Sequence, residues 1–408
     1  MRVNRPQNSA LTTSPKTRFA LVFGGMAAVI VGAAAVGSGV GFASDNSRHD
    51  GGGGSACSVP SRYPTIQAAV DATTCRTIKV APGAYTENVS ITRSLTLDGA
   101  KAGQDARNRR GGGESIINGG LLANVTITAN NVTIDGFTLN GPLNPGTAAL
   151  VMQTGNTGET IQNNIVNNPG RAASITTSRT TFRRNVVKNT LTATDGFQAN
   201  STPVRDLAFV SNSFSGANPA IYNADVTFIE GNANATVTDN ASTGDGTLVA
   251  LFKTAGAHIT DNSVIGGGGS SAVYVGGANS NVSVSGNTIS GAGSAVKVAN
   301  AFADGTNSGV NISRNTLRNN QYGVNVALGS TSNVVQVSRN AITGNSAFGV
   351  FNDPASGAAT NATCNWWGSR SGPGTVGHGS GDKVSTGVTY QPWLQSSSMS
   401  GDCRDGHH

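Results

Sequence analysis

An asparagine recurs along this chain at nearly regular intervals, each time three residues after an apolar residue. Neighbouring members of the series lie 21 to 28 residues apart, with a mean near 25. A fixed period of this length predicts a solenoid, in which each repeat packs only against its neighbours. The series comprises Asn164, Asn185, Asn212, Asn240, Asn262, Asn287, Asn315, Asn340 and, less regularly, Asn365.

Each repeat is too short for a pair of helices, and its apolar residues alternate with polar ones, which is the pattern of a strand. Two earlier units carry an aspartate where the later units carry asparagine, at Asp98 and Asp135. Counting these units gives roughly eleven coils. The sequence therefore predicts an all-β chain in which short strands of successive coils stack into parallel sheets.

The recurring asparagine has a physical explanation at a turn of each coil. Asparagine tolerates the left-handed backbone conformation that a sharp bend requires, and its amide can bond to the equivalent asparagine of the next coil. We therefore predict a buried asparagine ladder, with the ladder residues themselves in the left-handed conformation. Glycosylation acceptors would explain single asparagines but not their period.

One short helix is expected before the strands begin. Within residues 64–71, the apolar side chains of Ile66, Ala69 and Val70 have the i, i+3, i+4 spacing of an amphipathic helix. The segments that follow are short β-rich runs separated by Gly, Asn and Ser.

The charge of the chain is concentrated at its N-terminus. Of the 408 residues only 12% are charged, and the formal net charge is +6. Four of the 27 basic residues precede residue 19, where no acid occurs, so that 23 basic and 21 acidic residues remain from residue 44 on. A nearly neutral chain without a Lys/Arg-rich run makes nucleic acid an unfavourable partner.

The basic N-terminus is followed by an uncharged stretch, residues 19–43, that ends in small residues. This order is typical of a secretory signal peptide over residues 1–43. An uncleaved N-terminal membrane anchor is the alternative, because the stretch is long enough to span a bilayer. Residues 44–56 are Gly-rich and predict a flexible linker, residues 57–403 the β-helix domain and residues 404–408 a tail.

Four cysteines fit an oxidising, extracellular compartment. Their proximity in sequence suggests the disulfides Cys57 to Cys75 and Cys364 to Cys403, although four cysteines allow three connectivities. We expect no metal site, because there is no C-x2-C unit and no histidine forms a ligand pair with a cysteine. No cofactor is expected either.

The sequence resembles the right-handed parallel β-helix proteins of the pectin-lyase-like superfamily, in particular their NosD-like repeat proteins. The resemblance covers residues 63 to about 394. Residues 63–71, 80–89 and 95–100 look like the capping helix and first coils of that family, and Asn365-Trp-Trp-Gly368 with residues 371–373, 381–384 and 391–394 looks like its terminal segment. The resemblance implies a right-handed single-stranded β-helix with an N-terminal capping helix. It does not imply one function, because the superfamily hosts lyases, hydrolases, esterases, epimerases and non-catalytic surface proteins.

The catalytic patterns of the superfamily are incomplete here. Pectin methylesterase activity is unfavourable, because Thr227 stands where the nucleophilic carboxylate would be and the Gly-Arg-Pro-Trp segment is missing. Hydrolases of the polygalacturonase type need carboxylates on neighbouring coils, and Asp195 and Asp245 are the candidates. Each is also explained by ordinary Asp-Gly turn chemistry. For a lyase, Lys297 and Tyr274 are the candidate catalytic groups.

Two functions remain from this reasoning. The first is recognition of an extracellular polysaccharide by a secreted or surface-exposed β-helix without an identified catalytic constellation. The alternative is a carbohydrate-active enzyme, a lyase or hydrolase of an acidic polysaccharide such as pectin. We expect a monomer, because the N-terminal helix and the C-terminal tryptophan segment would cover the exposed sheet edges.

The sequence also predicts which face would contact a glycan. Eight to eleven residues after each ladder asparagine comes a short strand whose middle residue should point outward. This column mixes aromatic, basic and amide side chains, as a glycan-binding face would, although tyrosines on an exposed sheet are also explained by their β propensity. Its predicted members are Gln198, Tyr222, Ala250, Tyr274, Lys297, Asn325 and Phe351.

Overall fold

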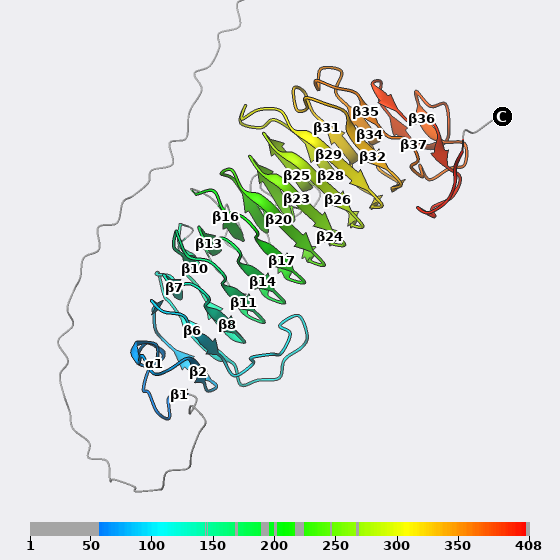
Figure 1. The fold of residues 1–408 in the computed structure, drawn as a ribbon. Helices are drawn as coiled ribbons and strands as arrows, with labels where there is room; N and C mark the ends of the chain where they lie inside the picture. Colours follow the sequence, from blue (N-terminus) through cyan, green and yellow to red (C-terminus); the bar gives the residue numbers. More distant parts are fainter. Residues whose placement is uncertain are drawn as a thin grey trace, which may run out of the picture. The chain divides into compact units, whose positions relative to one another are not determined.

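The computed structural model describes residues 57–142, 144, 146–167, 170–188, 196–199, 202–216, 224–244, 247–266 and 269–404. Within them the chain winds into a solenoid whose strands pair in parallel, each with the corresponding strands of the preceding and following coils. Figure 1 shows the coils stacked one after another. The 33 strands from β2 to β34 make eleven complete coils of three strands, which confirms the predicted single-stranded parallel β-helix.

Three parallel sheets run along the solenoid. The 14-stranded sheet contains β1 (Cys57–Val59), β2 (Thr77–Val80), β5 (Thr96–Asp98), β8 (Thr133–Asp135), β11 (Thr160–Gln162), β14 (Thr181–Arg183), β17 (Ala208–Val210), β20 (Ala233–Thr238), β23 (Ala255–Thr260), β26 (Ser280–Ser285), β29 (Ser308–Ser313), β32 (Val335–Ser338), β35 (Thr360–Asn361) and β38 (Val388–Thr389). The 11-stranded sheet contains β3 (Gly83–Tyr85), β6 (Ser115–Asn118), β9 (Phe137–Asn140), β12 (Ile165–Asn167), β15 (Val186–Lys188), β18 (Ser213–Ser215), β21 (Ala241–Thr243), β24 (Ser263–Ile265), β27 (Thr288–Ser290), β30 (Thr316–Arg318) and β33 (Ala341–Thr343).

The third sheet carries the predicted glycan-binding face. This 13-stranded sheet contains β4 (Val89–Ile91), β7 (Val125–Ile127), β10 (Ala148–Met152), β13 (Arg171–Ile175), β16 (Phe197–Ala199), β19 (Val226–Phe228), β22 (Val249–Phe252), β25 (Ser271–Gly277), β28 (Ser294–Val298), β31 (Tyr322–Val326), β34 (Phe348–Asn352), β37 (Gly381–Val384) and β36 (Pro373–Thr375). A separate antiparallel pair, β39 (Trp393–Leu394) and β40 (Cys403–Arg404), ends the described chain.

The core lies inside the coils, where one apolar side chain stacks on the equivalent side chain of the next coil. Most of these side chains are aliphatic, as in the column Ile259, Val284, Ile312, all of them completely buried. Five phenylalanines fill the interior of the coils around β14 to β19 instead, with ring centroids 4.7 to 5.8 Å apart. They are Phe182, Phe197, Phe209, Phe214 and Phe228.

The asparagine ladder is confirmed over its whole length. From Asn164 to Asn365, the Nδ2 group of each ladder asparagine donates to the Oδ1 atom of the next, at 2.9 to 3.2 Å, and all nine residues are buried. Each of these Oδ1 atoms also accepts the backbone N–H of the preceding member, as Asn287 does from Asn262. The ladder therefore holds consecutive coils in register.

The predicted left-handed conformation of the ladder residues is wrong. The left-handed residue is the one before each asparagine, for example Arg184 (φ 53°), Asp261 (φ 55°) and Arg314 (φ 55°). A ladder asparagine must direct its side chain into the turn to reach its neighbours, so the sharp bend falls one residue earlier. That position is occupied by Asn, Arg, Ser, Asp, Gly or Cys, so the preceding residue carries no recurrent sequence signal.

The expected helix is present as α1 (Ile66–Asp71). The Thr65 side chain caps it by accepting the N–H of Ala68, and the Glu87 carboxylate accepts the N–H groups of Ile66 and Gln67 at 3.0 Å. Its predicted apolar residues, Ile66, Ala69 and Val70, are buried against the first strands. The role of α1 as a cap remains a prediction.

Both predicted disulfides form, between Cys57 and Cys75 and between Cys364 and Cys403. The C-terminal tryptophans Trp367 and Trp393 are buried in the core of the last coils.

The described residues include no helix with the length and apolar character needed to cross a bilayer. They also include no group of three or more His, Cys, Asp or Glu side chains arranged to hold a metal ion. The predicted signal segment and linker, residues 1–56, lie outside the described residues.

Candidate functional site

The predicted outward column exists on the 13-stranded sheet, with one change of membership. Strand register places Tyr274 beside Lys297, Lys297 beside Asn325, and Asn325 beside Phe351, as expected. The residue between Gln198 and Ala250 in the column, however, is Thr227 on β19, which pairs with both of them. Tyr222 itself lies outside the described residues, and the column position predicted for it belongs to Thr227.

The part of this column on β16 to β25 is covered, which the sequence did not predict. The exposed fraction is 6% for Gln198, 2% for Thr227, 3% for Ala250 and 6% for Tyr274. Tyr274 and Ala250 form a small apolar cluster outside the main core with Ala224, Phe252 and Ala299. Strand alternation correctly predicts the direction of these side chains, but it contains no information about the segments that pack over them.

Three half-exposed aromatic side chains lie close together on β31 and β34 of the same face. The ring of Tyr322 stacks on that of Phe348 (centroids 6.3 Å apart, planes at 7°), and the ring of Phe351 lies 5.8 Å from Tyr322 and 5.2 Å from Phe348. Asn325 and Lys297 occupy the next two column positions beside Phe351, and both are half-exposed. We call these five residues the aromatic platform.

Sequence reasoning missed Tyr322 and Phe348 because strand alternation fails at these positions. In both strands two consecutive residues face the interior: Gly323 and Val324 in β31, Gly349 and Val350 in β34. A Cβ atom added to either glycine would lie 3.0 Å from the buried Ile342 side chain. The residue before each glycine therefore points outward rather than inward. The only available signal was the aromatic-Gly-Val sequence that the two strands share.

The two candidate catalytic groups of a lyase are neighbours. The Lys297 Nζ atom lies over the Tyr274 ring, 5.9 Å from its centroid, which is within the range of a cation–π contact. Lys297 is half-exposed and Tyr274 is buried, so the ammonium group of Lys297 is the more accessible of the two. The other candidates, Asp195 and Asp245, lie outside the described residues.

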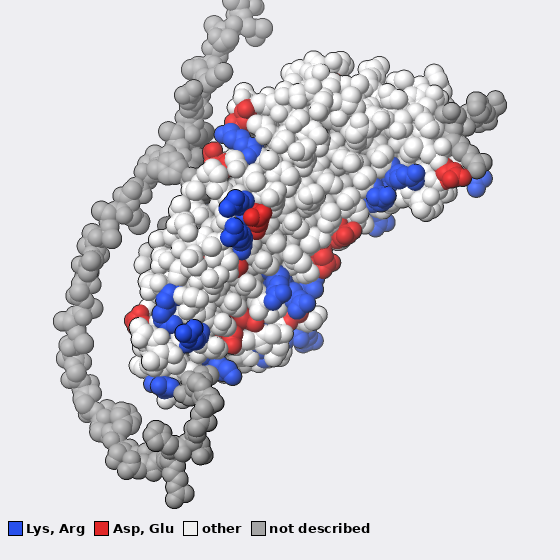
Figure 2. All heavy atoms as spheres, viewed as in Figure 1, with Lys and Arg blue, Asp and Glu red and all other residues white. Residues whose placement is uncertain are grey.

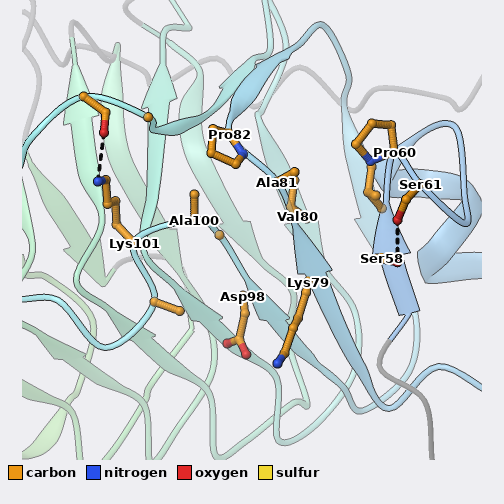
Figure 3. Close-up of a pocket in the computed structure, with 15 residues that line it drawn as sticks. Ser58, Pro60, Ser61, Lys79, Val80, Ala81, Pro82, Asp98, Ala100 and Lys101 are labelled. Carbon is orange, nitrogen blue, oxygen red and sulfur yellow. Dashed lines mark hydrogen bonds between the residues drawn. The ribbon is translucent and has the colours of Figure 1, made fainter.

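A hollow of ≈ 630 Å³ opens at the other end of the solenoid, beside β1, β2 and β5 (Figure 3). Its lining includes Lys79, Asp98 and Lys101 among small apolar side chains. Lys79 and Asp98 are partners in neighbouring strands, and their side chains extend in the same direction in Figure 3. Lys101 is engaged with the carbonyl oxygen of Gly112 at 2.9 Å.

The wall of this hollow is a long connection, residues 99–114, which we call the strap. Asp135 holds it in place: its carboxylate accepts the N–H of Gly103 at 3.1 Å, and also the amides of Gln162 (2.7 Å) and Asn163 (2.8 Å). Gly136 permits the close approach, because a Cβ atom there would lie 2.1 Å from the backbone nitrogen of Ala102. These hydrogen bonds give Asp135 a structural role, which is to hold the strap against the coils.

Asp98 differs from Asp135 in its environment. Burial raises the pKa of the Asp98 carboxyl, the neighbouring Asp135 charge raises it further, and Lys79 opposes the rise. A raised pKa means that the folded chain holds this proton more tightly than the unfolded chain. Ionisation of Asp98 therefore lowers the stability of the fold as the pH rises above the ordinary value of 3.8.

The change Asp98→Asn is expected to stabilise the protein at pH 7, where the native carboxylate is charged. The expected rise in melting temperature is small, no more than about 2 °C, because the site is open to water. At about pH 3 the carboxyl is protonated in both the folded and the unfolded state, so the variant and the wild type should have the same melting temperature. Thermal melts at both pH values check this, and an equal shift at both would contradict it.

Charged side chains do not form a single basic or acidic face on the side shown in Figure 2. Lys and Arg occur there in small groups near Asp and Glu, and large areas carry neither sign. This distribution agrees with the nearly neutral composition from residue 44 on.

No protein-family model matches the sequence, and no curated protein matches it. Among solved structures, the surface adhesin PfbA of Streptococcus pneumoniae is 12% identical, with 70% of this chain and 88% of the adhesin covered and a TM-score of 0.46. A mannuronan C-5 epimerase A-module from Azotobacter vinelandii is 16% identical (78% and 91% covered, TM-score 0.45). An alginate lyase from Paenibacillus sp. is 14% identical (61% and 91% covered, TM-score 0.43). These values describe a distant likeness, and the fold assignment rests on the sheets and registers described above.

Proposed function

We propose that the chain recognises an extracellular polysaccharide through the aromatic platform on the outer face of the 13-stranded sheet. The observation that carries this proposal is the cluster of Tyr322, Phe348 and Phe351, three half-exposed rings within 6.3 Å of one another on a rigid sheet. Large aromatic side chains that remain accessible in a cluster are typical of a binding surface.

The chemistry of the platform suits a sugar. A pyranose ring has apolar C–H faces that pack on an aromatic ring, and hydroxyl groups around its edge that need hydrogen-bond partners. The Asn325 amide can both donate to and accept from such hydroxyls, and the Lys297 ammonium can pair with a carboxylate. Because the partners come from successive strands about 4.8 Å apart, they form a row along the solenoid, which suits an extended polymer.

The setting of this activity is outside the cell. Two disulfides and no unpaired cysteine fit an oxidising compartment. With the signal-like residues 1–43, they support a secreted or surface-exposed protein. The burial of Trp367 and Trp393 at one end, and of α1 residues at the other, supports a monomer whose sheet edges are covered.

The second candidate function is an enzyme acting on an acidic polysaccharide, and the contact between Lys297 and Tyr274 favours it. In a lyase reaction, a base takes the proton α to a uronate carboxyl and the glycosidic C–O bond breaks; the leaving sugar oxygen takes up a proton from water, and a double bond remains in the other product. Lys297 in its neutral form could accept that proton. Incubation with uronate polymers tests this: appearance of double-bond absorbance or reducing ends supports the enzyme, and their absence rejects it.

Binding is tested with a platform variant, Phe348→Ala combined with Phe351→Ala. Losing two stacking faces is expected to weaken binding of the recognised polysaccharide about tenfold or more. The measurement is affinity electrophoresis or calorimetry against a panel of neutral and acidic polysaccharides, with melting curves to confirm folding. The control combines Leu122→Ala with Ile265→Ala, which removes two exposed apolar side chains away from the platform. Unchanged affinity in a folded platform variant would contradict the proposal.

A further inference from the structure

A second hollow, of ≈ 300 Å³, lies at the turn that leads from the 13-stranded sheet to the 14-stranded sheet near β13. It differs from the first hollow in being lined by polar groups on several successive turns. Two arginines and a set of hydroxyl groups surround it, comprising Arg179, Arg205, Thr154, Thr157, Thr176 and Ser178.

The two arginines are held next to each other by the backbone. The N–H of Arg179 donates to the carbonyl oxygen of Arg205 at 2.9 Å, across adjacent coils. The N–H of Arg205 donates to the Ser178 hydroxyl at 3.2 Å, so that this hydroxyl lies at the same turn. The coil spacing therefore places two guanidinium-bearing residues about 4.8 Å apart on one wall of the hollow.

Neither arginine is neutralised by the part of the protein that the structure describes. Both residues are exposed, and neither side chain forms an ion pair or hydrogen bond among the described residues. The nearest acid in sequence, Asp206, accepts a hydrogen bond from the Asn234 amide at 3.1 Å. Two like charges on adjacent coils repel each other, and an anion placed between them would remove that repulsion.

We propose that this hollow, which we call the arginine pocket, binds an oxyanion carried by an acidic polysaccharide. A guanidinium group presents paired N–H donors that match the oxygens of a carboxylate or a sulfate, and serine and threonine hydroxyls can donate to the remaining oxygens. A carboxylate would come from a uronic acid and a sulfate from a sulfated sugar. The shared requirement is a negatively charged oxygen group.

The polymer part of this inference rests on the proposed function, and it narrows the substrate class from polysaccharides to anionic ones. The arginine pocket adjoins β13, and the aromatic platform spans β28 to β34 of the same sheet. Six strand steps separate β13 from β31, or about 29 Å along the solenoid at 4.8 Å per step. A polymer of several sugars is long enough to reach from one site to the other.

Small anions test the pocket without any polymer. Sodium glucuronate and sodium sulfate are titrated into labelled protein while the Arg Nε–H resonances are followed by NMR. A saturable shift of the Arg179 and Arg205 signals with either salt, and not with sodium chloride at equal ionic strength, supports the pocket and shows which anions it accepts. Absence of a saturable shift with both salts would overturn the inference, whatever the outcome of the platform experiment.

Polymer binding then tests the link to the platform. The variant Arg179→Gln/Arg205→Gln is compared with Arg76→Gln/Arg318→Gln, which removes two exposed arginines elsewhere and has the same net charge. For oligogalacturonate and dextran sulfate, the pocket variant should lose about tenfold in affinity at low salt, while binding of an uncharged dextran stays unchanged. Equal losses in the two variants would mean that only the overall charge matters, and would refute a specific pocket.

Discussion

Asn287→Ala is expected to lower the free energy of unfolding by about 3 kcal/mol or more, a large effect for one polar side chain. The Asn287 amide donates to the carbonyl oxygens of Ile259 and Ser285 and to the Oδ1 atom of Asn315. Its own Oδ1 atom accepts two N–H groups of Asn262. Truncation leaves several buried donors and acceptors without partners, and each such group carries a desolvation penalty of about 1–3 kcal/mol.

Chemical denaturation followed by circular dichroism measures this effect. The matched control is Asn311→Ala. Asn311 is exposed on β29, close to the ladder, and its side chain forms no hydrogen bond with the described residues. Its expected effect is within about 0.5 kcal/mol. If both variants unfold at the same denaturant concentration as the wild type, the ladder is not a source of stability.

The second large effect is expected for Phe209→Ala, which should cost about 3–5 kcal/mol. The Phe209 side chain is completely buried and lies between the rings of Phe182, Phe197 and Phe228, at centroid distances of 4.9, 5.5 and 5.8 Å. A cavity left there cannot close easily, because each surrounding ring belongs to a different strand fixed by its ladder of backbone bonds.

The measurement is again denaturation, together with amide hydrogen exchange, which reports where the structure is loosened. The exchange should increase in the coils around β14 to β19, because a solenoid transmits stability only through neighbouring coils. Phe302→Ala serves as the control, since that side chain is 57% exposed, and it should change stability by less than about 1 kcal/mol. Comparable losses in the two variants would contradict the described core.

The ladder and the strands were predictable because each asparagine reports both the period and the register. The left-handed residue was not predictable. An inward-pointing asparagine requires the bend to fall on the preceding residue, and that residue varies from coil to coil. A local sequence pattern therefore identifies which residue is buried at a turn, but not which residue bends the backbone.

Tyr222 shows the limit of counting residues between repeats. Thirteen residues lie between Asn212 and Val226, where β19 starts, whereas the expected interval was eight to eleven. Both Ile221-Tyr-Asn223 and Val226-Thr-Phe228 have an apolar first residue, so the sequence alone did not show which of the two pairs with β16. Only the pairing of Gln198 with Thr227 settles the register.

The candidate site was predictable in part for the same reason. Lys297, Asn325 and Phe351 were placed correctly because they follow regular strand alternation. Tyr322 and Phe348 depend on a break in that alternation, and the burial of Tyr274 depends on contacts with Phe252 and Ala299. Phe252 is the last residue of β22 and Ala299 follows β28, so both lie past the apolar-x-apolar residues that carry the periodic signal.

The two disulfides have a consequence for the way the stack can come apart. In a quasi-one-dimensional protein a terminal coil has one neighbour instead of two, so coils peel away most readily from the ends. Cys57 and Cys75 link the first strand to the turn before the second, and Cys364 and Cys403 link the last ladder turn to the final strand. Each disulfide therefore ties the outermost strand to the segment beside it, so that this strand cannot leave alone and the end of the stack has to separate as a larger unit.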